Sequence, residues 1–404
     1  MKLPRVLPTR LFLSLASLVL VSQLQAKPLK VFILAGQSNM QGHAKIETFD
    51  YIGDDPATAP LLKEMRDAAG KPRVCDKVWI SSVGCLGDAY TDLTEKTGNL
   101  TAGFGAPGGK IGPEFTFGIF TEKQLGGPIL IIKTSWGGRS LHTDFRSPSA
   151  GPYVPTAEEV KRWAEKPEKK RESDAATGVY YREMVAHVKE VLADAKRVCP
   201  VYDEKQGYEL AGFVWLQGFN DLVSSDTYPA KPGEKVRDYS KYGEWLADLI
   251  RDVRKDLAAP KMPFVIGVLG VDGLNANADT KAFRVAMAAP ALLPEFTGNV
   301  TAIETAPFWA EELGAIDIKK DKVRQMSHFL NSKHKDHANA DGTMTQEEKR
   351  EYLKEFEGRT ITPAEAAMWQ RGASNGGYHY LGCAKTFALM GKAFAEELMK
   401  ITAR

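Results

Sequence analysis

The sequence predicts an α/β protein with a mainly parallel sheet covered by helices on both faces. Short apolar segments rich in β-branched residues recur along the chain, and amphipathic segments of helical period separate them. The strand-like segments are apolar throughout and do not alternate with polar residues, which is typical of a parallel sheet buried on both sides. The hydrophobic content of 43% is sufficient for such a core.

Six segments combine a short apolar run with flanking turn residues and are predicted to be strands: 30–35, 78–83, 129–134, 210–216, 264–269 and 300–304. Five longer segments carry apolar residues at helical spacing and are predicted to be helices: 114–124, 179–197, 239–257, 281–292 and 384–400. Three polar or charged segments interrupt this alternation and are predicted to be surface insertions near 50–72, 146–177 and 326–362. We therefore expect a single domain over 27–404.

The first 26 residues have the pattern of a secretory signal. Three basic residues precede an apolar stretch over 11–21, and the small residue Ala26 ends the segment as at a signal-peptide cleavage site. The apolar stretch is too short to span a bilayer, which takes about 20 residues. We expect cleavage near Ala26 and a mature protein that is secreted or periplasmic and has no membrane span.

The net charge and the cysteine pattern limit the kinds of ligand that the protein is expected to bind. The formal charge of +2 includes the three basic residues of the signal, so the mature chain is close to neutral. This argues against nucleic acid as a partner, because such proteins carry a basic face. The four cysteines match no zinc pattern, and a Cys75–Cys85 disulfide and buried free thiols remain alternatives for Cys75, Cys85, Cys199 and Cys383. The oligomeric state stays open.

Ser38 is the candidate nucleophile. It follows the apolar run 31–35 and a glycine turn, and polar residues come next where a helix could begin. A serine needs a base for its proton and donors for the oxyanion that forms, and a helix start supplies backbone N–H donors. A serine that only caps the helix is the alternative interpretation.

Three further groups supply what acyl transfer requires beside a serine. Thr134–Ser140 contains a glycine turn where backbone N–H groups can approach a ligand, and Gln217–Asp221 offers side-chain amides. His379 provides an imidazole just before the last predicted helix. Because the carboxyl ends of parallel strands share one edge of a sheet, the first two groups and Ser38 are expected to converge.

The ordered strings GQSNM, KTSWGGR and GFND, followed by a late histidine, resemble the SGNH hydrolase superfamily and most of all its sialate O-acetylesterase and acetylxylan-esterase-like carbohydrate esterases. The resemblance runs from about residue 30 to the last helix. It implies a three-layer α/β/α fold and metal-free hydrolysis of acyl esters, commonly acetyl groups on sugars, with no cofactor.

Carried over by this resemblance, Ser38 is the nucleophile and His379 is the general base. The backbone N–H groups of Ser38 and Gly138 (or Gly137) and the side chain of Asn220 form the oxyanion hole. We also expect substrate contacts from Gln37 and Trp136, which lie next to these site residues in sequence, and from Arg139 and Gln217. An ion pair with a carboxylate is the alternative for Arg139.

One departure from the family pattern concerns the partner of His379. An aspartate often stands three residues before the histidine, and that position is Gly376 here, next to the neutral Asn375. A carboxylate normally holds the imidazole tautomer and stabilises its cation. The alternatives to this aspartate are a backbone carbonyl, a Ser–His dyad without a third residue, and a carboxylate from Asp221 or Glu304.

The segment 337–348 resembles a calcium-binding EF-hand loop, with four residues at ligand positions: Asn339, Asp341, Thr345 and Glu348. It begins with His337 instead of an aspartate, so we favour a turn followed by a helix-capping box from Thr345 to Glu348. The whole sequence thus predicts an exported serine esterase acting on O-acetylated sugar or polysaccharide. A carbohydrate-binding protein on a degenerate esterase scaffold is the alternative.

Overall fold

The computed structural model describes residues 27–84 and 93–402, and the predicted signal segment lies outside them. Seven strands form one sheet in the order β3-β2-β4-β1-β5-β6-β7. All neighbouring strands are parallel except the pair β2 and β3. This confirms the α/β fold class. The strands are β1 (Leu29–Gly36), β2 (Val78–Val83), β3 (Lys96–Asn99), β4 (Ile129–Ser135), β5 (Tyr208–Leu216), β6 (Phe264–Val268) and β7 (Val300–Glu304).

All six predicted strands are present, and β3 is the strand that the sequence did not indicate. It has four residues, includes Gly98, and pairs antiparallel with β2 at the edge of the sheet. Its residues alternate between half-buried and exposed, so it lacks the apolar run by which the other strands were recognised.

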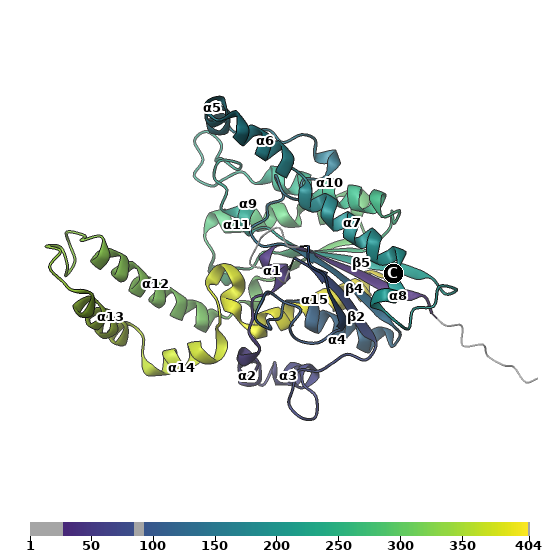
Figure 1. Cartoon of the computed structure of the whole chain (residues 1–404), viewed down its shortest axis with the longest axis horizontal. Helices are drawn as coiled ribbons and strands as arrows, with labels where there is room; N and C mark the ends of the chain where they lie inside the picture. The colour runs from purple at the N-terminus through teal and green to yellow at the C-terminus, as the bar shows by residue number, and fades with distance from the viewer. Residues whose placement is uncertain (1–26, 85–92, 403–404) are drawn as a thin grey trace, which may run out of the picture.

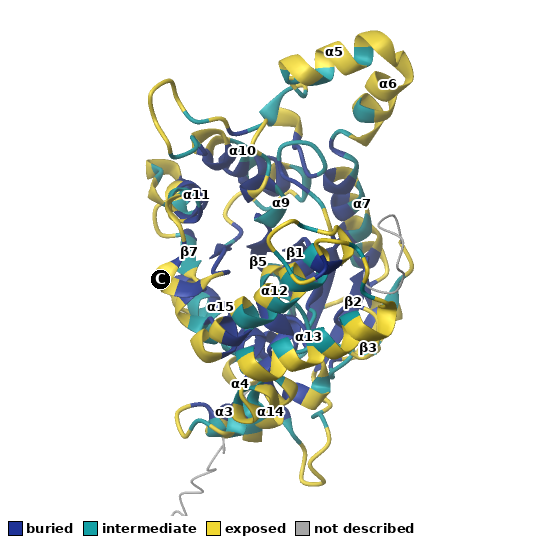
Figure 2. Ribbon diagram, turned by 90° about the vertical axis from the view of Figure 1, so that its left-hand side faces the viewer, coloured by how far each residue is buried: buried dark blue, intermediate teal, exposed yellow. Residues whose placement is uncertain are grey.

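Helices cover both faces of the sheet (Figures 1 and 2), with α7 and α10 on one side and α4 and α15 on the other. Helices α4 and α15 pack closely because Gly391 has no side chain, and an added Cβ would lie 2.1 Å from the Pro113 carbonyl oxygen. The main helices around the sheet are α4 (Glu114–Leu125), α7 (Val179–Ala193), α8 (Ala195–Val198), α10 (Ser240–Asp256), α11 (Ala278–Ala288) and α15 (Ala384–Thr402).

Two predicted helices are interrupted. The segment 179–197 divides into α7 and α8 at Asp194, whose carboxylate accepts a hydrogen bond from the Arg197 backbone N–H and caps the second helix. The segment 281–292 changes from α11 to the 3-10 helix η4 (Ala289–Leu292), where Pro290 lacks a backbone N–H for the α-helical ladder.

The predicted insertions form separate helical elements (Figure 1): α2 (Asp50–Gly53) with α3 (Ala59–Met65), and α5 (Ala157–Glu165) with α6 (Pro167–Ala176). The third is an arm of α12 (Glu311–Asn331), α13 (Gln346–Thr360) and α14 (Pro363–Gly372), in which α12 and α13 project from the sheet. Residue 326, where this insertion was predicted to begin, lies inside α12 because the charged surface helix starts earlier, after β7 and the short helix η6 (Ala306–Phe308).

Short helical turns connect these elements: α1 (Ser38–Gln41), α9 (Phe219–Leu222), η1 (Ile46–Thr48), η2 (Pro148–Ala150), η3 (Gly273–Asn275), η5 (Pro294–Phe296), η6 (Ala306–Phe308) and η7 (Gly377–Gly382). Within the described ranges, every helix is too short or too polar to cross a membrane. Cys75, Cys199 and Cys383 are buried free thiols. Cys85, the possible partner of Cys75, lies outside the described residues.

Candidate active site

The carboxyl ends of β4, β1 and β5 lie side by side in the middle of the sheet. Helix α1 begins directly after β1, and α9 begins two residues after β5. The turn that contains Gly138 follows β4. The fold thus brings Ser38, Gly138 and Asn220 to one edge, as the parallel arrangement predicted.

A sharp turn presents Ser38. Gly36 packs so closely on β5 that an added Cβ would lie 2.1 Å from the Leu216 carbonyl oxygen, so only glycine fits there. Ser38 is the first residue of α1, and its backbone N–H therefore has no acceptor within the helix. Its side chain retains 7% exposure. The turn can thus offer both a hydroxyl and an N–H donor to the same ligand.

The amide of Gln37 ties this turn to the end of β5. Its Nε2 donates to Asn220 Oδ1 (2.8 Å), and its Oε1 accepts from the Gly218 N–H (3.0 Å) and from Gln217 Nε2 (3.1 Å). Both glutamines are 1% exposed. Our expectation that Gln37 and Gln217 contact substrate is therefore replaced by a positioning role, because their amides are buried and bonded within the protein.

Asn220 and Gly138 face each other across the edge. Asn220 Nδ2 donates one proton to the Gly138 carbonyl oxygen (3.1 Å) and carries a second N–H. Gly138 has a φ of 69°, a left-handed conformation that favours glycine. Because Gln37 holds the other end of the amide, the orientation of Asn220 is set before any ligand arrives.

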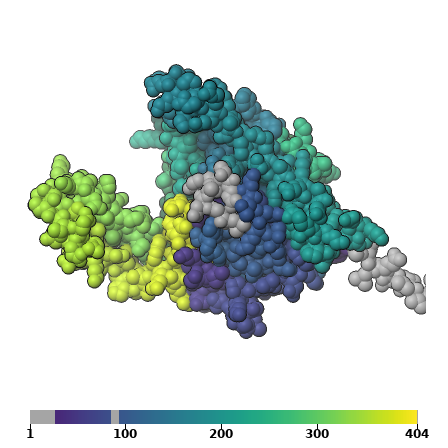
Figure 3. All heavy atoms as spheres, in the orientation of Figure 1, coloured from purple at the N-terminus to yellow at the C-terminus, as the bar shows by residue number. Residues whose placement is uncertain are grey.

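His379 lies in η7, beside α1. Asn39 Nδ2 donates to the Tyr378 carbonyl oxygen (3.2 Å), so the residue after Ser38 is bonded to the residue before His379. In Figure 3, atoms from the start of the chain (purple) lie directly beside atoms from its end (yellow). The structure brings the predicted serine and histidine segments together.

The backbone next to His379 is strained. Tyr380 and Leu381 both have positive φ values (49° and 61°), which cost energy for residues with a Cβ. The buried Tyr380 hydroxyl holds this turn, because it accepts from the Gly270 N–H (2.7 Å) and hydrogen-bonds to Thr305 (2.8 Å). Such strain occurs where the surrounding structure fixes a functional group.

Asn375 is the hydrogen-bond partner of His379. The His379 Nδ1 lies 3.2 Å from Asn375 Oδ1, and among the described residues no carboxylate bonds to this ring. The two carboxylate candidates are wrong. Asp221 bonds to His142 instead, and the described structure gives Glu304 no hydrogen bond to the His379 ring.

A second imidazole, His43, lies against the first. The rings stack with centroids 3.8 Å apart and planes 7° from parallel. Burial, with a contribution from the Lys110 ammonium, lowers the pKa of His379 to about 4. Sequence reasoning missed His43, and its position five residues after Ser38, behind Gly42, is the signal that could have drawn attention to it.

Asp221 supports the loop that follows Gly138. Its buried carboxylate accepts hydrogen bonds from the Leu141 N–H (2.8 Å), His142 Nδ1 (3.0 Å) and the Tyr228 hydroxyl (2.7 Å). Burial alone would raise the pKa of Asp221, but hydrogen bonds from His142 and neighbouring donors lower it. Asp221 thus stays ionised and holds the loop after Gly138.

The other two residues predicted to contact substrate, Trp136 and Arg139, support the same loop by packing and by an ion pair. Trp136 is 1% exposed and packs against Tyr180 and Phe145, so it is a core residue, because the turn after β4 points its ring inward. Arg139 pairs with Asp144 (3.3 Å) and stacks on the ring of Tyr180 (4.4 Å), which is the ion pair we had held as the alternative.

The EF-hand-like segment has its oxygens engaged elsewhere. The capping box that we favoured is present, since Thr345 and Glu348 bond reciprocally at the start of α13. Asn339 bonds to the Leu330 carbonyl oxygen and the Met344 N–H, and Asp341 bonds to Thr343. Asn339, Asp341 and Glu348 are thus used by the turn and the helix cap.

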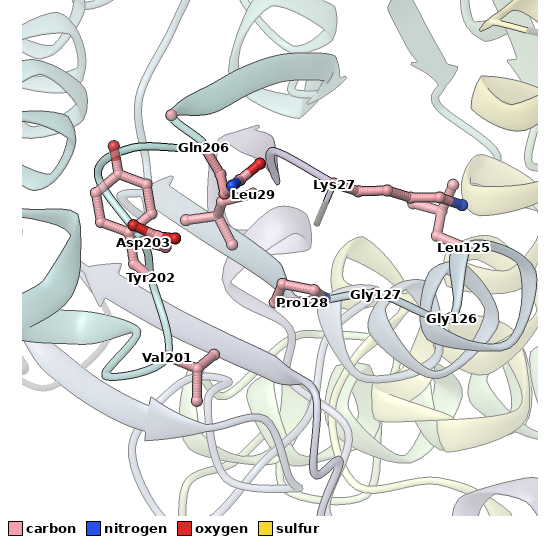
Figure 4. A pocket seen from close by; sticks show the side chains of 11 residues that line it. Lys27, Leu29, Leu125, Gly126, Gly127, Pro128, Val201, Tyr202, Asp203 and Gln206 are labelled. Atoms are coloured by element: carbon pink, nitrogen blue, oxygen red, sulfur yellow. The ribbon is translucent and has the colours of Figure 1, made fainter. Parts of the chain in front are cut away.

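A cavity of about 440 Å³ lies at the opposite end of the sheet (Figure 4), lined among others by Leu29, Pro128 and Tyr202. Leu29 starts β1, whereas Ser38 follows its end, and a strand of eight residues spans about 26 Å. This cavity is therefore separate from the edge that carries Ser38.

A comparison with known protein families places the chain in one of them. Residues 28–306, more than half of the chain, match the model of a family described as carbohydrate esterase, sialic acid-specific acetylesterase. The chain belongs to this family. Membership indicates hydrolysis of acetyl esters on carbohydrates. The match includes Ser38, Gly138 and Asn220 and ends before His379, which lies beyond residue 306.

Two solved structures are similar to the chain at low identity. A protein of Arabidopsis thaliana is 18% identical, with a TM-score of 0.37, over 69% of this chain and 86% of that one. A carbohydrate acetylesterase of Xanthomonas citri is 16% identical, with a TM-score of 0.37, over 68% of this chain and 49% of that one. No protein with a curated description matches the sequence significantly.

Proposed function

We propose that this protein is an exported serine esterase that removes acetyl groups from a carbohydrate through an acetyl-enzyme intermediate. The observation that carries the proposal is the hydrogen bond between Asn39 and Tyr378, which joins the segments of Ser38 and His379 at the edge where Asn220 and Gly138 also lie. Family membership supports the acetylated carbohydrate as substrate, and the predicted signal over 1–26 supports export.

In the first half of the reaction, Ser38 Oγ attacks the acetyl carbonyl carbon while His379 Nε2 takes the hydroxyl proton. The N–H groups of Ser38 and Gly138 and the amide of Asn220 stabilise the oxyanion. The carbon–oxygen bond to the sugar then breaks, and the sugar oxygen takes the proton from Nε2. In the second half, His379 deprotonates water, which attacks the acetyl-enzyme. Ser38 recovers its proton and acetate leaves.

The direct test combines acetate release with active-site labelling. The purified mature protein is incubated with a panel of O-acetylated sugars and polysaccharides, and with a fluorophosphonate probe that labels activated serines. We expect acetate from at least one acetylated carbohydrate and probe attached to Ser38. Carbohydrate binding without either reaction would instead indicate the non-catalytic alternative.

Replacing Asn220 by alanine should lower kcat about 10²- to 10³-fold, because one oxyanion donor is lost. KM should change little, since the donor acts on charge that develops in the transition state. Asn220→Asp keeps the size and removes the donor, so it should lose activity as well. Asn331→Ala, at the end of the distant α12, is the matched control and should retain full activity. Full activity in Asn220→Asp would contradict the role.

The activity should persist in acid. The base works only when its imidazole is neutral, and the pKa of His379 is lowered to about 4 by burial and by Lys110. The value of kcat/KM should therefore be flat near neutral pH and fall as pH drops through about 4, instead of near 6.5 as for a free imidazole. Acetate release measured across this range checks the expectation, and a midpoint at 6 or above would contradict it.

A further inference from the structure

We propose that His43 is a positioning residue for the catalytic base: together with Asn375 it holds the orientation and the tautomer of His379, in the place where other serine hydrolases use a carboxylate. The inference rests on the proposed function, in which His379 is the base. It adds a residue, and a way of orienting the imidazole, that membership of the family does not supply.

Ring stacking restrains His379. The two imidazoles lie face to face, 3.8 Å between centroids and 7° from parallel. His43 follows Gly42, which ends α1 with a φ of 87° and turns the chain back toward η7. The ring of Tyr378 also contacts His379, with centroids 4.4 Å apart. The His379 ring therefore cannot rotate without displacing a neighbouring ring.

The amide of Asn375 connects the two imidazoles. Its Oδ1 accepts from the Gly376 N–H (2.8 Å) and lies 3.2 Å from His379 Nδ1, and its Nδ2 lies 3.4 Å from His43 Nδ1. The backbone N–H identifies the oxygen end of the amide, because a flipped amide would lose that bond. Asn375 Nδ2 thus donates to His43, and His379 Nδ1 donates to Asn375.

This network determines the tautomers. With its proton on Nδ1, His379 keeps the lone pair on Nε2 free to accept a proton from a serine. His43 must accept at Nδ1 and so carries its proton on Nε2. A neutral amide and a neutral imidazole can therefore orient the base without adding a negative charge beside it.

The hydrogen bond to Asn375 explains why residue 43 is a histidine. Its Nε2 is buried without a partner among the described residues, and a buried polar atom without a hydrogen bond has an energetic cost. A phenylalanine would fill the same space and stack without that cost. What the histidine adds is Nδ1, the atom that Asn375 faces.

Burial, assisted by nearby lysines, keeps both rings neutral. Lys110 lowers the pKa of both imidazoles, and Lys133 lowers the pKa of His43 as well. Burial, then the neighbouring His379 and these lysines, lower the pKa of His43 to about 3. Asp317 of α12, the carboxylate beside Gly377, pairs with Arg324. During turnover the proton from a serine can thus reside on His379 alone.

Three substitutions separate stacking from hydrogen bonding. His43→Phe keeps a stacked ring and removes the acceptor, His43→Asn keeps an acceptor near the Nδ1 position and removes the ring, and His43→Ala removes both. We expect kcat to fall about 10- to 100-fold in the phenylalanine and alanine variants, with KM within about twofold, and partial recovery in the asparagine variant. His328→Phe, on the exposed side of α12, is the matched control.

A second measurement does not depend on turnover. Side-chain ¹⁵N NMR of histidine-labelled protein reports the tautomer of His379, assigned by its loss in His379→Gln. The wild type should show protonated Nδ1, and His43→Phe should show a mixture of tautomers. An unchanged tautomer together with wild-type kcat in a folded His43→Phe variant would overturn the proposal. If no acetyl ester is hydrolysed, the proposed function fails, whereas the NMR comparison still decides the role of His43.

Discussion

Replacing Ser38 by alanine is expected to remove ester hydrolysis, with kcat at least about 10⁴-fold below that of the wild type. The acetyl-enzyme cannot form without Oγ, and water held near His379 would replace only a small part of the rate. Because the Ser38 side chain is small and at the start of a helix, the fold should be preserved, with an unfolding midpoint close to the wild-type value. Acetate release and fluorophosphonate labelling measure the loss.

The matched control is Ser225→Ala, in an exposed turn after α9, which should leave acetate release and labelling unchanged. Residual turnover in Ser38→Ala within about tenfold of the wild type would show that another group performs the reaction. Labelling of a different serine in the wild type would have the same meaning.

Replacing Lys133 by methionine should lower the free energy of unfolding by about 3–5 kcal/mol, the largest stability effect that we expect. Lys133 Nζ pairs with Glu114 (2.8 Å), and both side chains are fully buried. It also donates to the carbonyl oxygens of Gln41 (2.7 Å) and Phe104 (2.8 Å). The substitution leaves the Glu114 carboxylate buried without its cation, beneath the turn that carries Ser38. Urea-induced unfolding measures the change.

Two variants sharpen this measurement. Lys123→Met breaks an ion pair with Glu64 at the surface and should cost less than about 1 kcal/mol. Adding Glu114→Gln to Lys133→Met should recover part of the loss, because no uncompensated charge then remains. A loss below about 1 kcal/mol in Lys133→Met alone would show that the buried pair contributes little to stability.

Most strands were predictable because each is a short apolar run that contains its own signal. Strand β3 was not, since its four residues are recognised only by pairing with β2. Lys133 shows an intermediate case. A lysine inside the apolar run of β4 is unusual enough to indicate a buried partner, but its position does not name Glu114, which starts α4.

The sequence by itself determined the fold class and the residue types for acyl transfer, with Ser38, Asn220 and His379 as candidates. It did so because short apolar runs and glycine turns are local properties of the chain. The tertiary structure determined which side chains contact one another. Only packing shows that Asp221 serves the loop of His142, that Gln37 and Gln217 are buried supports, and that Asn375 and His43 face the imidazole. These contacts join residues far apart in sequence, and burial and hydrogen-bond geometry exist only once the chain has folded.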